Sequence, residues 1–233
     1  MNPFCQHHLE AVDPYFRRSD RWRSFSASGF FTADVVDEVR KVLADRGTKG
    51  HLRGLLLELL DGSPAADQLQ PELTALMLDP HANDHIRALA ADCIVSSRKT
   101  DIATNVGNLI AEGSPAALKV ACRICTDVEA LRQNDELMLE LLRQCCSLYP
   151  PRDTWRERTI EPRYFIKRLI RLFDLAVAET LLDKLTKGLA CTCGAKHAHE
   201  CACRDGISKI VGMLLDRYFE LAEPPHDPQR VYG

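Results

Sequence analysis

The chain has 233 residues, of which 45% are hydrophobic and 27% are charged, and its formal net charge is −3 with neutral histidines. This composition is typical of a soluble globular protein, and no apolar run approaches the ~20 residues that a membrane-spanning helix needs. The first residues have neither a basic start nor an apolar core, so we expect no secretory signal and a cytoplasmic location.

Helical periodicity recurs from about residue 32 to residue 222, whereas strand-like alternation is almost absent. The sequence therefore predicts an all-α fold. Short amphipathic helices of this kind bury their apolar faces by stacking on their neighbours, which favours an architecture of stacked antiparallel helix pairs. In the first two thirds of the chain the expected helices span residues 33–46, 52–60, 71–78, 84–95, 102–111, 115–125 and 135–148.

A five-residue pattern recurs within this helical part. Gly-Ser-Pro-Ala-Ala occupies residues 62–66 and again residues 113–117, each time after an acidic residue at an apolar helix end. In both copies Ser is a favourable N-cap, and Pro is favourable at the first helical position because its missing N–H costs nothing there. The recurrence therefore predicts a helical repeat.

Two sets of side chains are expected in the core of this part. The helix over residues 84–95 places Ile86, Leu89, Ala90, Cys93 and Ile94 on one face. Free cysteines among aliphatic residues commonly act as small hydrophobic side chains. We therefore expect core positions for four cysteines, Cys93, Cys122, Cys125 and Cys145.

The chain changes character at Pro150-Pro151, where we place a domain boundary. The predicted division is a cap segment at 1–31, helical repeats at 32–150 and a C-terminal helical part at 151–233. In the C-terminal part, Arg163, Lys167 and Arg171 follow one another at i, i+4 and i+8 opposite an apolar face. This stripe suits phosphate or an acidic protein surface, and the alternative is a solvated helix face with local carboxylate partners. Further helices are expected at 175–189 and 207–221.

The runs at residues 52–60, 73–80 and 86–94 resemble HEAT-type helical repeats. Residues 34–130 are similar to the repeats that follow the nucleotide-binding core of bacterial STAND (NACHT-type) NTPases. The ATPase module of that family is not present, because the chain contains no G-x-x-x-x-G-K-[ST] phosphate loop. The resemblance thus implies a sensor or scaffold portion, or a relative that lacks the motor.

The segment at 191–203 concentrates six side chains that are competent to bind zinc. Four of them suffice for a closed tetrahedral site, either as four cysteines or as three cysteines with one histidine. The H-E-x-x-H metalloprotease motif is absent, which favours a structural zinc ion that holds the helices on either side of the segment. The alternative is a loop of reduced cysteines. The six residues are Cys191, Cys193, His197, His199, Cys201 and Cys203.

Residues 14–31 interleave aromatic and basic side chains, which suits either base stacking with phosphate contacts or an end cap on the first helices. No nucleophile elbow, glycine-rich dinucleotide loop or carboxylate pair of recognisable spacing occurs. The sequence therefore favours a non-enzymatic helical scaffold or sensor that binds a protein partner. One alternative is a nucleic-acid-binding helical repeat that uses residues 14–31 and 156–171, and another is a hydrolase site assembled in the repeat groove.

Overall fold

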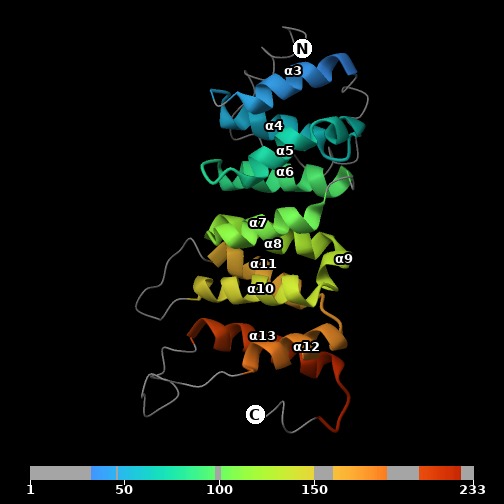
Figure 1. Ribbon diagram of the computed structural model, residues 1–233, viewed down its shortest axis with the longest axis vertical. Helices are drawn as coiled ribbons and strands as arrows, with labels where there is room; N and C mark the ends of the chain where they lie inside the picture. Colours follow the sequence, from blue (N-terminus) through green and yellow to red (C-terminus); the bar gives the residue numbers. More distant parts are fainter. Residues whose placement is uncertain (1–32, 46, 98–100, 150–159, 188–204, 227–233) are drawn as a thin grey trace. The chain divides into compact units, whose positions relative to one another are not determined.

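The computed structural model describes residues 33–45, 47–97, 101–149, 160–187 and 205–226, and every regular element in them is helical (Figure 1). The all-α prediction is confirmed, since these residues contain no strand. Among them, no helix combines the length and the apolar character needed to cross a lipid bilayer. The helices belong to two compact units, and the boundary between residues 105 and 106 lies within α7 (Ile102–Glu112).

Before α7, the described residues of the first unit form the α-helices α3 to α6 and the short 3₁₀ helix η2. Helix α6 packs against both α4 and α5, so its side chains are buried around most of its circumference. Four of the five residues predicted on one face of this helix, Ile86, Ala90, Cys93 and Ile94, are buried, and Leu89 is half-buried. Burial also extends to Arg87, which is not one of these five residues. The elements are α3 (Ala33–Ala44), α4 (Gly50–Leu60), η2 (Pro64–Gln68), α5 (Gln70–Leu78) and α6 (Asp84–Ser97).

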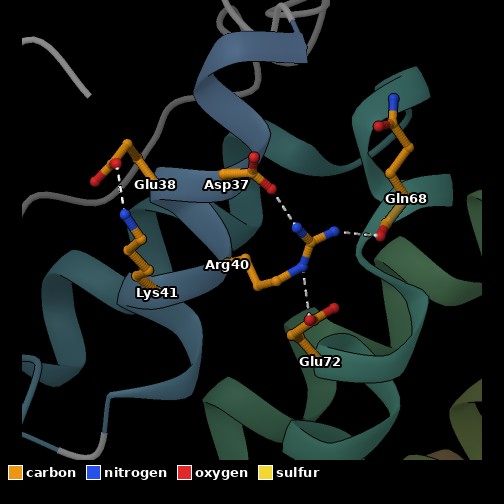
Figure 2. Close-up of polar contacts among 6 residues, drawn as sticks. All are labelled: Asp37, Glu38, Arg40, Lys41, Gln68 and Glu72. Carbon is orange, nitrogen blue, oxygen red and sulfur yellow. Dashed lines mark hydrogen bonds and ion pairs between the residues drawn. The ribbon is translucent and has the colours of Figure 1, made fainter.

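Arg40 of α3 connects three elements of the first unit (Figure 2). Its Nε donates to Glu72 Oε1 at 2.8 Å, and a terminal nitrogen donates to the Gln68 carbonyl at 3.1 Å. The other terminal nitrogen pairs with Asp37 one helical turn earlier. Because the Arg40 side chain is 39% exposed, these contacts contribute about 1 kcal/mol at most and mainly orient α3 on η2 and α5.

The recurring Gly-Ser-Pro-Ala-Ala pattern has the same backbone role in both places. Gly62 after α4 and Gly113 after α7 have φ values of 73° and 66°, in the left-handed region that glycine adopts without a steric penalty. Ser63 Oγ accepts from Ala65 N at 3.2 Å, and Ser114 Oγ accepts from Ala117 N at 3.1 Å. The predicted caps are confirmed, although the first copy begins the 3₁₀ helix η2 and the second begins an α-helix.

The second unit packs α8 against α11 and α12 against α13. The proposed domain boundary after residue 150 falls inside this unit, because α11 lies after that position and α8 before it. Residues 150–159 are outside the described ranges. The elements that follow α7 are α8 (Pro115–Asp127), α9 (Glu129–Arg132), α10 (Asp135–Cys145), η3 (Cys146–Leu148), α11 (Ile160–Ile170), α12 (Leu175–Thr186) and α13 (Asp205–Leu221).

The core role predicted for the four cysteines is confirmed, since each of them is completely buried. Cys93 Sγ donates to the Leu57 carbonyl at 3.2 Å, which ties α6 to α4. Cys122 of α8 and Cys145 of α10 place their sulfur atoms 3.9 Å apart, and this contact together with burial raises the pKa of Cys122. Burial likewise raises the pKa of Cys125 to about 12. Such thiols stay protonated at neutral pH and serve packing.

Candidate functional site: the groove between α11 and α13

Helix α11 divides its residues into a buried face and an exposed face. Ile166, Leu169 and Ile170 are buried. Their positions at i, i+3 and i+4 lie on one side of the helix, the side that packs against α8. The opposite side carries exposed Tyr164, Lys167, Arg168 and Arg171, the last of which follows the final helical residue. The amphipathic pattern of α11 therefore directs a basic surface away from the core.

Helix α13 is amphipathic in the same way. Ile210, Leu214 and Tyr218 are buried at steps of four residues, on the side of the helix that packs against α12. Met213 is partly exposed, and Asp216 and Phe219 are exposed. Because α11 and α13 also contact each other, exposed side chains of the two helices lie next to one another.

A groove of about 400 Å³ lies between these two helices. The α11 side contributes Lys167, Ile170 and Arg171 to its lining. The α13 side contributes five residues, Met213, Asp216, Arg217, Phe219 and Glu220. The lining therefore combines cationic, anionic and apolar groups, an arrangement that can bind a ligand both by charge and by apolar contact.

Arg217 is fixed in place within this groove. Its Nε donates to the Phe173 carbonyl at 2.9 Å, and a terminal nitrogen pairs with Glu220 Oε2 at 3.1 Å. The ion pair neutralises Glu220, and the hydrogen bond to Phe173 ties α13 to the residues after α11. In contrast, Lys167 and Arg171 make no side-chain ion pair or hydrogen bond with the part of the chain that the structure describes. They are the cations of the groove that can meet a ligand.

The structure separates the three residues of the predicted anion-binding stripe. Lys167 and Arg171 line the groove, but Arg163 does not. Arg163 Nε donates to the Leu148 carbonyl at 2.7 Å, and its guanidinium lies 4.8 Å from the centre of the Tyr149 ring. Burial raises the pKa of the Tyr149 hydroxyl to about 12 even though Arg163 opposes this shift. Arg163 thus holds α11 to the end of η3.

The sequence reasoning missed all five contributions of α13 to the groove, Met213, Asp216, Arg217, Phe219 and Glu220. They follow from the contact between α11 and α13, which are separated by more than thirty residues along the chain. The available signal was the amphipathic pattern of α13, which leaves Met213, Asp216 and Glu220 off the apolar face. That pattern alone does not reveal which helix lies beside α13.

The most exposed large hydrophobic side chains of the described residues are close in sequence to this groove. Tyr164 is 63% exposed, Leu172 is 45% exposed and Phe219 is 43% exposed. They belong to α11, to the turn after α11 and to α13, respectively. We call these three residues the exposed apolar set. Scattered exposed hydrophobic residues are common, but large ones concentrated on neighbouring elements are typical of an interaction surface.

The predicted zinc ligands lie outside the described residues, as do residues 14–31 and the Arg156 and Arg158 positions of the basic segment 156–171. This applies to all six zinc candidates, Cys191, Cys193, His197, His199, Cys201 and Cys203. Within the described ranges, no three His, Cys, Asp or Glu side chains gather closely enough to hold a metal ion.

No protein-family model, curated protein sequence or solved structure matches this chain. The resemblance of residues 34–130 to HEAT-type repeats of STAND NTPases therefore stays a prediction. A helical fold by itself hosts many functions, so the groove and the exposed apolar set are the features of the described residues that bear on function.

Proposed function

We propose that this chain is a non-enzymatic helical scaffold that binds a protein partner through the surface formed by α11 and α13. The observation that carries the proposal is the exposed apolar set, Tyr164, Leu172 and Phe219. Large aromatic and aliphatic side chains of this kind are the usual anchors of protein interfaces. The adjacent cations Lys167 and Arg171 add the polar rim that such interfaces have.

The finer architecture that we propose is a HEAT-like stack of helix pairs. It is supported by the two equivalent helix ends, at which a left-handed glycine is followed by a capping serine. It is also supported by the packing of helices that are adjacent in sequence, such as α5 on α6 and α12 on α13. The proposed scaffold is non-enzymatic because the sequence contains no nucleophile elbow, glycine-rich dinucleotide loop or H-E-x-x-H motif.

Site-specific crosslinking in the cells that make this protein tests the scaffold function. A photoreactive amino acid replaces exposed Leu172 in the full chain, and the control carries it at exposed Arg143 on α10. We expect one discrete protein adduct at position 172 and none at position 143. The adduct is identified by mass spectrometry, and its binding is reproduced with purified components. No adduct at position 172, or identical adducts at both positions, would contradict the scaffold proposal.

The Cys/His segment at 191–203 carries a separate proposal, a structural zinc ion held by four of its six candidate ligands. Its support is chemical, because thiolate and imidazole groups at this density are the preferred zinc donors. The basic neighbours Lys196 and Arg204 would offset the negative charge of a four-thiolate site. A zinc ion in this position would join α12 to α13 and thereby support the groove.

Elemental analysis of the purified full chain tests the zinc proposal. We expect about one equivalent of zinc, and its loss when Cys191 and Cys203 are both changed to Ser. The control Cys146→Ser changes a half-buried cysteine outside the segment and should retain the metal. Removing zinc with a chelator should lower the melting temperature, because binding free energy contributes to folding. Metal-free protein of unchanged stability would rule out a structural zinc ion.

A further inference from the structure

We infer that the groove between α11 and α13 binds a short acidic peptide segment that carries one large apolar side chain. The inference rests on the proposed scaffold function and specifies the chemistry of the partner. A groove of about 400 Å³ lies near the lower end of the ~300–1,000 Å³ range of ligand sites, so it suits a few side chains of a segment.

The charges of the groove favour an acidic ligand. Among its five charged side chains, Arg217 and Glu220 neutralise one another at 3.1 Å. Lys167 and Arg171 remain on the α11 side, and Asp216 remains on the α13 side. Arg168, exposed on α11 and next to Lys167 in the chain, adds a third cation to this helix. The α11 side therefore attracts carboxylates, whereas Asp216 disfavours them on the α13 side and so sets the orientation of the segment.

The apolar part of the groove provides a place for one anchoring side chain. Ile170, Met213 and Phe219 line it together. Phe219 is 43% exposed, and its ring packs edge-to-face against His226 with centroids 4.9 Å apart, which restrains its orientation. Met213 is unbranched and flexible and adapts to the shape of an inserted group. An aromatic or leucine side chain of the ligand would fit against these three residues.

A nucleic acid is the less suitable ligand for the same residues. Binding to a phosphate backbone depends on many cations that each replace a counterion. The groove lining offers two cations, Lys167 and Arg171, that have no ion-pair partner among the described residues, together with the Asp216 carboxylate, which repels phosphate. In addition, its apolar lining matches the anchor of a peptide better than a charged sugar-phosphate chain.

Fluorescence anisotropy with the purified full chain tests the inference. The probe is a short fluorescein-labelled peptide of Glu and Asp residues around a single Phe. Two matched peptides replace the acidic residues with Gln and Asn, or the Phe with Ser. We expect saturable binding of the acidic probe that weakens at high salt, and at least about tenfold weaker binding of each matched peptide.

Variants of the protein then locate the binding site. Lys167→Glu with Arg171→Glu should weaken binding of the acidic probe by at least about tenfold, because it places like charges opposite the ligand. The control Arg143→Glu with Lys187→Glu makes the same change in net charge at exposed positions outside the groove, and it should leave affinity within about twofold. Phe219→Ala should also weaken binding by about tenfold through loss of the apolar contact.

Each other result would overturn the inference in an identifiable way. Equal losses from the groove variant and its control would show a general charge effect. Equally tight binding of the uncharged peptide would show that the ligand of the groove need not be acidic. Tighter binding of a single-stranded DNA probe at the same residues would identify a nucleic acid, and not a peptide, as the ligand. If a partner crosslinks at position 172 but no acidic probe binds, the scaffold function stands and the acidic-segment inference fails. Thermal melts of all variants test whether each of them is folded.

Discussion

Replacing Gly206 with Ala is expected to lower the free energy of unfolding by about 3 kcal/mol. Gly206 lies at the start of α13 against η3, where an added Cβ would overlap the Cys146 carbonyl oxygen and lie 2.7 Å from its carbonyl carbon. Both atoms belong to the backbone, so no side chain can rotate to relieve the contact. The start of α13 or η3 must therefore move, with a loss of packing between them.

Gly212 in the same helix provides a matched control for this substitution. An added Cβ at Gly212 meets nothing within 4 Å, so Gly212→Ala should stabilise the chain by up to about 1 kcal/mol through helix propensity. Urea unfolding and thermal melts measure both variants, and Gly206→Ala should lower the melting temperature by roughly 5–10 °C. Equal effects of the two substitutions would contradict the close approach of α13 to η3. Because α13 forms one side of the groove, Gly206→Ala should also weaken binding of the acidic probe.

Helix positions were predictable where local chemistry determines them. The ends marked by Gly62 and Gly113 and the caps made by Ser63 and Ser114 depend on neighbouring residues alone, and the structure has them as expected. The helix start at Pro64 was predicted, but the short 3₁₀ form of η2 was not, although its first residues repeat those of α8. The difference lies in Pro71, which cannot donate to a preceding carbonyl and forces a new helix start, so the chain forms η2 and then α5.

The groove was only partly predictable because it depends on contacts between distant segments. Lys167 and Arg171 could be singled out from helical spacing, since i and i+4 residues share a face. Residues four positions apart also differ in direction by about 40° around the helix axis. Arg163 is therefore offset from Lys167 and Arg171, and its side chain contacts the Leu148 carbonyl. The contribution of Phe219 depends on the packing of α13 beside α11, which no local pattern encodes.

The burial of Arg87 was also beyond the sequence pattern, and it leads to the second large expected effect. The Arg87 side chain is only 1% exposed, and its Nε donates to the Met77 carbonyl at 2.8 Å, in the last turn of α5. That carbonyl is among the last four of the helix, which have no partner within the helix itself. Arg87 therefore stabilises the α5 end and connects it to α6.

Arg87→Met is expected to lower the free energy of unfolding by about 3 kcal/mol, because methionine fills part of the space but leaves the buried Met77 carbonyl without this donor. Lys49→Met, at an exposed position in the same unit whose side chain makes no cap hydrogen bond, should change stability by no more than about 0.5 kcal/mol. Arg87→Lys should recover only part of the loss, since an ammonium group cannot reproduce the planar guanidinium geometry. Urea unfolding of the three variants measures these differences. A fully stable Arg87→Met protein would mean that apolar packing alone holds α5 on α6.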